Sequence, residues 1–335
     1  MRRAAQLAIV GALVCATAAA RAQSAPIKVR MSAIAPDGTA WARELRAFSR
    51  NFEERTFGRV QMKWYFGSIA GDEVAALDRI RRGQLDGAAG AGFCDRLAPS
   101  LRVTRVLGLF QSHEESSYVL GRLRATLDAE FRKSGFVGHV SGMGNDILFS
   151  RQPIRSLAEL RHTKLFLWNI DDLMISQMKQ IGVQTVPLPV EEARQAYEDG
   201  RTDGFITFPT AALAYQWSSQ TRFFTDLRFG FFRGCIVVSN RVIDSWPIAD
   251  QQAFHEAVAK LSVRIEDLGR VQDQALLSSL FAKQGVRPVP ASEVFRAEFF
   301  SAVREARTRL DPKLLSPELL QRVEGWLADY RAEHR

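Results

Sequence analysis

Segments with the period of a strand alternate with segments with the period of a helix, and this alternation constrains the fold more than any other feature of the chain. Residues 27–33 carry an apolar side chain at every second position, which is typical of a strand. Residues 41–52 then carry apolar side chains at helical spacing, and both patterns return at 60–64 and 74–80, before Gly83. Such alternation is typical of parallel βαβ units with helices on both faces of a sheet. The sequence therefore predicts an α/β fold.

The length of the chain and one internal similarity predict two lobes. About 310 residues remain after the amino-terminal segment described below, which is more than one hydrophobic core usually holds. Residues 83–87 and 200–204 both read Gly-x-x-Asp-Gly, and each follows a predicted helix and precedes a predicted strand. We expect this repeat to place the same βαβ unit in each lobe.

One very long helix is predicted from about residue 248 to residue 284. This stretch contains no proline, its only glycine is Gly269, and apolar side chains recur in it at helical spacing. Some 36 residues would extend about 50 Å at 1.5 Å per residue, enough to lie along both lobes. A break near Gly269 is the alternative.

The amino terminus predicts secretion. Arg2 and Arg3 precede an apolar run from about Ala4 to Ala19, and small residues follow near Ala22, so residues 1–22 are predicted to be a cleavable signal peptide. No later segment has the roughly 20 apolar residues that span a bilayer. We therefore expect the mature protein in the periplasm.

Charge and cysteine content exclude several classes of function. Without three arginines of the signal peptide, 42 basic and 37 acidic residues leave a net charge of +5 (45 − 3 = 42; 42 − 37 = 5). The basic residues are scattered, so we expect no nucleic-acid partner. The mature chain keeps Cys94 and Cys235, whose spacing matches no metal or redox motif. The periplasm would permit a disulfide, but we favour two buried thiols.

Catalytic motifs are absent from the sequence. The five histidines have no paired metal-ligand spacing, and there is no nucleophile elbow or phosphate-binding loop. Residues 142–144 begin like a dinucleotide loop but lack its third glycine, and are interpreted as a crossover between lobes. We expect no metal, no cofactor and no enzymatic activity. A hydrolase built on carboxylates stays an alternative, because one sequence does not show which carboxylates pair in space.

Several segments resemble the solute-binding proteins of TRAP transporters, of the DctP type. The similar segments are Phe-Glu-Glu-Arg-Thr-Phe-Gly-Arg-Val at 52–60, Gly-Ser-Ile-Ala-Gly-Asp-Glu at 67–73, Arg-Gly-Gln-Leu-Asp at 82–86, and the stretches 153–164, 187–204 and 245–247. They follow the order of the family along nearly the whole mature chain. The resemblance implies a two-lobed periplasmic binding protein fold (type II-like), with a central cleft and a long lobe-spanning helix. It also implies delivery of a small-molecule ligand to the membrane subunits of a TRAP-type transporter. We expect the protein to be a monomer.

The predicted lobes follow from this resemblance. Lobe I comprises residues 26–141 and 228–265, and lobe II comprises residues 142–227 and 270–325. The long helix at 248–284 connects them.

Two positions depart from the family pattern and change the expected ligand. In most of the family, an arginine in the strand that matches residues 164–168 binds a ligand carboxylate through two hydrogen bonds, but this chain has Phe166 there. A polar amide usually follows the second Asp-Gly, where this chain has Thr207 or Phe208. The sequence resembles a divergent branch without the usual arginine. We therefore predict a neutral or substantially apolar ligand.

Ligands of open α/β sheets bind beyond the carboxyl ends of strands, and this rule selects the first candidate site residues. It selects Phe166 and Trp168, which share one side of their strand, and Thr207 and Phe208. For the two aromatic residues of the 164–168 strand, core packing is the alternative.

Four further candidates come from positions near the predicted cleft. Trp41 begins the first helix and could cover the cleft or lie in the core. Glu73 begins the second helix and could bind the ligand or be an ordinary first-turn carboxylate. Asn145 lies at the crossover between the lobes. Its side chain could contact the ligand in the cleft, or its amide could stabilise a turn. Arg233 is the first candidate to replace the missing arginine, whereas Trp217 is interpreted as a helix-packing residue.

Two other functions stay open at this point. The same lobes could hand a hydrophobic ligand to a periplasmic partner other than a permease, or they could form a cryptic hydrolase.

Overall fold

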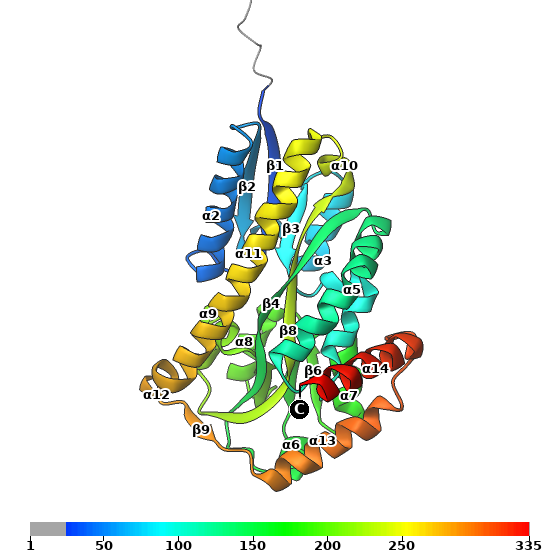
Figure 1. The fold of residues 1–335 in the computed structure, drawn as a ribbon. Coiled ribbons are helices and arrows are strands. Elements are labelled where there is room, and N and C mark those ends of the chain that lie inside the picture. Colours follow the sequence, from blue (N-terminus) through cyan, green and yellow to red (C-terminus); the bar gives the residue numbers. More distant parts are fainter. Residues whose placement is uncertain (1–24, 335) are drawn as a thin grey trace, which may run out of the picture.

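The computed structural model describes residues 25–334, so the predicted signal peptide lies outside the described residues. Figure 1 shows the arrangement of the elements, with colours that follow the sequence. The strands are β1 (Ile27–Ala33), β2 (Val60–Phe66), β3 (Gly87–Gly90), β4 (Phe136–Ser150), β5 (Leu165–Trp168), β6 (Thr185–Leu188), β7 (Gly204–Thr207), β8 (Phe223–Ser239) and β9 (Arg287–Val289). The α-helices are α2 (Ala40–Arg55), α3 (Glu73–Arg81), α4 (Cys94–Leu97), α5 (His113–Lys133), α6 (Leu157–Arg161), α7 (Asp172–Gln180), α8 (Ala193–Glu198), α9 (Pro209–Ala214), α10 (Asn240–Ile243), α11 (Ile248–Ala275), α12 (Phe281–Lys283), α13 (Glu293–Arg307) and α14 (Pro317–Glu333).

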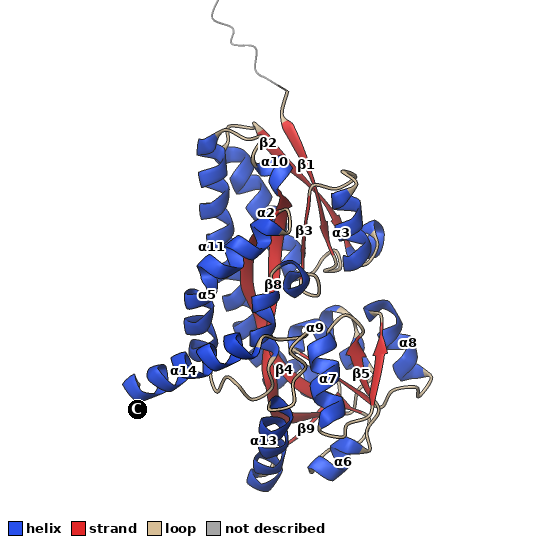
Figure 2. Ribbon diagram, turned by 90° about the vertical axis from the view of Figure 1, so that its right-hand side faces the viewer, coloured by secondary structure: helices blue, strands red, loops and turns tan. Residues whose placement is uncertain are grey.

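Two long strands join two lobes into one sheet. The strand order is β2-β1-β3-β8-β4-β7-β5-β6, with β9 paired to β8. β1 is parallel to β2 and β3 in lobe I, and β5 is parallel to β6 and β7 in lobe II. The antiparallel pair β4 and β8 extends through both lobes, which Figure 2 shows one above the other. The predicted two-lobed α/β fold is confirmed.

The repeated Gly-x-x-Asp-Gly segments are equivalent parts of the two lobes. Gly83 and Gly200 both adopt a φ of +72°, a left-handed conformation that glycine adopts without steric cost, after α3 and α8. In lobe I, Asp86 accepts a hydrogen bond from the backbone N–H of Arg30 in β1 at 2.8 Å. In lobe II, Asp203 accepts one at 3.3 Å from the N–H of Lys164, directly before β5. Each aspartate thus ties its helix–strand unit to the neighbouring parallel strand.

The long helix lies along both lobes, as Figure 1 shows. α11 runs without a break through Gly269 and continues through a π-helical turn, Leu276–Leu280, into α12. Gly269 faces the crossover of β4, because a Cβ there would overlap the carbonyl oxygen of Met143. The glycine therefore permits close packing of the helix on the sheet and does not interrupt the helix.

Apolar helix faces cover both faces of the lobe I part of the sheet. On one face, Phe48 and Phe52 of α2 pack with Trp246 and with Phe254 of α11. Thr39 caps α2 by accepting a hydrogen bond from Ala42 N–H at 3.2 Å. On the other face, the leucines of α5 pack with the last helix, α14. α14 thus lies on lobe I, whereas the prediction placed residues up to 325 in lobe II.

Cys94 and Cys235 form a disulfide, so the prediction of two buried thiols is wrong. Gly90 at the end of β3 pairs with Cys235 in β8, and Cys94 begins the helix that follows, which brings the two Cα atoms to 5.9 Å. The cysteines are 141 residues apart in the sequence, and only the pairing of β3 with β8 makes them neighbours. None of the described helices is long and apolar enough to span a membrane.

Candidate functional site

The cavity between the lobes, here the principal cavity, lies where parallel strands of both lobes end, and its volume is about 140 Å³. Two larger cavities, of about 360 and 330 Å³, lie along α2 and α11 and are not lined by strand residues. Its walls include the carboxyl ends of β1 and β3 from lobe I and of β5 and β7 from lobe II, with the side of α11. This is the position at which open α/β sheets bind ligands. The cavity is close in size to an engineered protein cavity of about 150 Å³ that holds benzene.

Six of the eight candidate residues line this cavity: Trp41, Glu73, Phe166, Trp168, Thr207 and Phe208. Trp41 begins α2 and meets Phe208 edge to face, with ring centroids 5.7 Å apart. Phe208 also packs against Phe232 of β8, at 5.3 Å. Aromatic rings from α2, from the end of β7 and from β8 therefore meet at the cavity.

A second aromatic group surrounds Phe166, the residue at which the sequence resemblance leads us to expect the family arginine. Its ring packs edge to face on Trp217 at 5.5 Å, and Trp217 stacks on Tyr215 at 5.2 Å. All three residues line the cavity. The sequence predicts Trp217 to be a helix-packing residue, and in the structure it both packs on Phe166 and lines the cavity.

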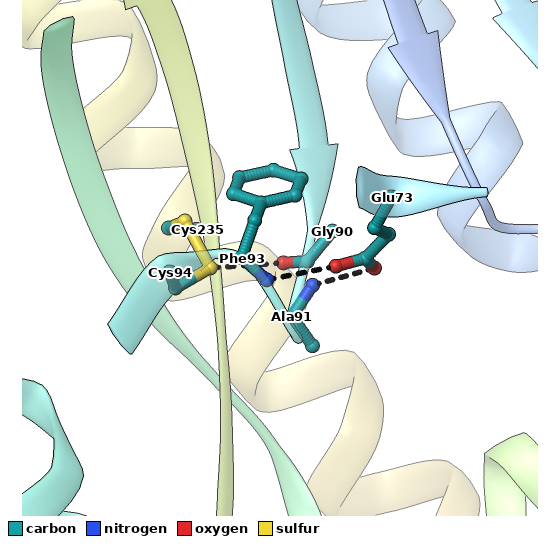
Figure 3. Close-up of a disulfide and its surroundings, with 6 residues drawn as sticks. All are labelled: Glu73, Gly90, Ala91, Phe93, Cys94 and Cys235. Carbon is teal, nitrogen blue, oxygen red and sulfur yellow. Dashed lines mark hydrogen bonds between the residues drawn. A yellow bond between two sulfur atoms is a disulfide. The ribbon is translucent and has the colours of Figure 1, made fainter. Parts of the chain in front are cut away.

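Glu73 and the disulfide hold the segment after β3, as Figure 3 shows. The Glu73 carboxylate accepts hydrogen bonds from Ala91 N–H at 2.9 Å and from Phe93 N–H at 3.0 Å. A Cβ at Gly90 would overlap this carboxylate, so the close approach requires glycine. Burial raises the pKa of Glu73 to about 7, although the backbone N–H groups favour its charged form. Cys235 of the disulfide also lines the cavity.

An arginine that the sequence reasoning missed also lines the cavity. Arg105 donates from Nη1 to Asp146 Oδ2 and from Nη2 to Asp171 Oδ2, both at 2.6 Å, and from Nε to Asp171 Oδ2 at 3.2 Å. Its guanidinium carbon lies 4.6 Å from the centre of the Phe232 ring. Burial opposes the charge, but the two carboxylates outweigh burial and raise the pKa of Arg105 above its ordinary value.

The rule that selected Trp168 could have found Asp171, which lies three residues beyond the end of β5 and also lines the cavity. Arg105 ends a 3₁₀ segment, Pro99–Arg105, and no local pattern marked it.

The two remaining candidates lie outside the principal cavity. Arg233 donates from Nη2 to Ser116 Oγ of α5 at 2.6 Å, and its Nη1 is 3.9 Å from Glu266 of α11. Burial lowers the pKa of Arg233 to about 10, against the effect of Glu266. Arg233 lines a neighbouring cavity of about 30 Å³ and is not part of the lining of the principal cavity. Asn145 lies within β4, paired with Phe231, and its backbone N–H donates to Asp273.

Among residues 25–334, no cluster of three or more His, Cys, Asp or Glu side chains is arranged to hold a metal ion. The arrangement is that of a binding site: a cavity between two lobes with mostly aromatic and aliphatic walls and a few polar groups.

The fold and this cavity define the class of two-lobed solute-binding proteins. A profile of the bacterial extracellular solute-binding proteins of family 7 (DctP) matches residues 31–310. The chain therefore belongs to this family, whose members are not enzymes.

Curated relatives are distant. An uncharacterised protein of Haemophilus influenzae is 24% identical over 296 residues, which cover 85% of this chain and 87% of that protein. A solute-binding protein of Chromohalobacter salexigens is 26% identical over half of each chain. The 2,3-diketo-L-gulonate-binding periplasmic protein YiaO of Escherichia coli is 24% identical, over 47% of this chain and 49% of that protein. The chain thus matches only about half the length of the latter two relatives.

Solved structures of TRAP periplasmic solute-binding proteins share the fold. One from Haemophilus influenzae with bound L-gulonate has a TM-score of 0.82 at 16% sequence identity. The matched region covers 90% of this chain and 99% of the Haemophilus influenzae chain. One from Roseobacter denitrificans with bound L-galactonate has a TM-score of 0.80 at 17% identity, over 89% of this chain and 98% of its own.

Proposed function

We propose that this chain is a periplasmic receptor that captures a neutral or substantially apolar small molecule between its lobes and delivers it to the membrane subunits of a TRAP-type transporter. Residues 1–22 direct secretion and are then removed, and the mature protein acts as a monomer. The family supports the transport role, because its members are extracellular solute-binding proteins.

One observation carries the choice of ligand: no lining arginine is free to bind a carboxylate. By the sequence resemblance, Phe166 stands where the family usually has arginine. Arg105 already pairs with two carboxylates of its own chain. A ligand carboxylate would lose its hydration without gaining a bidentate partner, at several kcal/mol. An aromatic-sized apolar surface would instead contribute about 25 cal/mol per Å² buried. The solved relatives above hold sugar acids, so this chain would differ from them.

Native mass spectrometry of the protein purified from a periplasmic extract tests the proposal. It reports the mass of any retained ligand, the loss of residues 1–22 and the number of chains in one step. Calorimetry then compares the retained ligand with simple dicarboxylates, which we expect to bind at least tenfold more weakly. Submicromolar binding of a dicarboxylate that persists in Phe166→Ala would refute the proposed ligand class.

A further inference from the structure

Carboxylates outnumber cations at the polar end of the principal cavity. Its lining contains one arginine, Arg105, and two carboxylates, Glu73 and Asp171. Asp146 is buried behind Arg105 and pairs with the same guanidinium. One positive charge thus faces three carboxylates, and no lysine or second arginine lines this cavity in the part of the chain that the structure describes.

The guanidinium of Arg105 is engaged by its own chain. All three of its nitrogens donate to Asp146 or Asp171. The second oxygen of Asp146, Oδ1, is buried without a hydrogen-bond partner among the described residues. Burial raises the pKa of Asp146, against the effect of Arg105. When both aspartates are ionised, their charge exceeds that of Arg105 by one, and a ligand anion then approaches an excess of negative charge.

Glu73 adds a carboxylate from the opposite lobe. Glu73 is 3% exposed, and its carboxylate accepts hydrogen bonds from the backbone N–H groups of Ala91 and Phe93, which carry no charge. Asp171 belongs to lobe II, at the amino terminus of α7. Carboxylates of both lobes thus line one cavity, where a cation would relieve their repulsion.

The aromatic walls form a second, independent argument. Seven aromatic residues line the cavity: Trp41, Phe166, Trp168, Phe208, Tyr215, Trp217 and Phe232. Faces of aromatic rings attract cations, and aromatic cages are the usual protein sites for organic ammonium groups. Arg105 already uses the Phe232 ring in this way.

We infer that the ligand of this cavity is an aromatic-sized organic cation, with a protonated amine between Glu73 of lobe I and Asp171 of lobe II and an apolar body against the aromatic walls. This inference rests on the proposed function, since it concerns the same cavity, and it narrows the ligand to one chemical class. Most of such a ligand is apolar, and its single charge balances the excess of carboxylates.

Three matched probes test the sign of the preferred charge: benzylamine, benzyl alcohol and benzoate. They share one ring and differ in charge, so calorimetry at millimolar concentrations isolates the electrostatic contribution. We expect benzylamine to bind at least tenfold more tightly than benzyl alcohol, and benzoate to bind most weakly. Tightest binding by benzoate, or equal binding of amine and alcohol, overturns the inference.

The variant Glu73→Gln tests the role of this carboxylate. We expect the preference for benzylamine over benzyl alcohol to fall at least tenfold in this variant, and its far-UV circular dichroism spectrum reports whether it is folded. Unchanged binding of benzylamine contradicts the assignment.

The pH dependence gives a readout that a purely structural role would not produce. The pKa of Glu73 is raised to about 7, chiefly by burial, and the titratable groups near it are Asp72 and Tyr215. Arg105, Asp171 and the buried Asp146 share the polar end of the cavity and are the same in both proteins. Benzylamine should therefore bind more tightly at about pH 8 than at about pH 5.5 in the wild type, and this gain should shrink in Glu73→Gln. An equal gain in both proteins contradicts the inference.

The failure of this inference is distinguishable from failure of the proposed function. If none of the three probes binds but a retained solute does, the ligand class is wrong and the receptor function stands. If neither probes nor any retained solute bind, both proposals fail.

Discussion

His139 and His255 form a pair between β4 and α11, with Nε2 of His139 3.0 Å from Nδ1 of His255. Burial, with smaller effects of His255 and of Arg124, lowers the pKa of His139 to about 4. The pKa of His255 is lowered too, by burial and Arg132, and Asp128 acts in the opposite direction. Because the folded protein resists protonation here, the unfolded chain binds more protons below about pH 6.5. The stabilisation by neutral His139 is thus complete above this pH and is lost as pH falls toward 4.

We predict that unfolding free energy decreases by about 2 to 3 kcal/mol through His139 between about pH 6.5 and pH 4. Urea denaturation at both pH values measures this loss of unfolding free energy. In His139→Gln the loss should be smaller than in the wild type by the about 2 to 3 kcal/mol assigned to His139. The exposed His162→Gln is the control and should keep the full loss of the wild type. An identical pH dependence in His139→Gln and wild type would contradict the prediction.

At the scale of the element, α11 packs on the crossover of β4 through Gly269. A Cβ at this position would overlap the carbonyl oxygen of Met143, a backbone atom that cannot move away without shifting the strand. We predict that Gly269→Ala destabilises the protein by about 1 to 3 kcal/mol, because overpacking outweighs the better helix propensity of alanine. Urea denaturation measures the change.

Gly325→Ala in α14 is the matched control for this prediction. No atom lies within 4 Å of a Cβ built at Gly325, so only helix propensity changes there. We expect a stabilisation of about 0.5 to 1 kcal/mol. Equal stabilisation by both substitutions would show that close packing at Gly269 does not limit stability.

At the scale of the whole molecule, two long antiparallel strands and one long helix join the lobes. The pairing of β4 with β8 shifts register between Gly142 and Gly144 and again between Asp146 and Leu148. These irregularities lie beside the cavity, where a ladder without regular pairing bends more easily. We predict that the lobes close about this region when ligand binds.

Small-angle scattering of the ligand-free and ligand-saturated protein measures this closure as a smaller radius of gyration. The protein stripped of retained solute by partial unfolding and refolding is the reference. A variant that no longer binds the solute is the control, and its radius of gyration should not change when the same solute is added. An unchanged radius in the wild type, with binding shown by calorimetry, would count against closure.

The sequence by itself determined the features that depend on local periodicity. Apolar residues at every second or every third to fourth position predicted the first strands and helices, and the absence of proline from 248 to 284 predicted the long helix. The repeated Gly-x-x-Asp-Gly predicted one equivalent unit in each lobe. The rule that ligands bind beyond strand ends then selected Phe166, Trp168, Thr207 and Phe208, all of which line the cavity.

Tertiary structure alone decided the features that join distant residues. Arg105 pairs with residues 41 and 66 positions away, and Cys94 bonds to a cysteine 141 positions away. No local pattern encodes such a pairing, since it depends on which strands become neighbours in the sheet. For the same reason the direction of Arg233, toward α5 and α11 and away from the principal cavity, could not be predicted: side chains of one strand alternate between faces, and only the packed helices define which face borders the cleft.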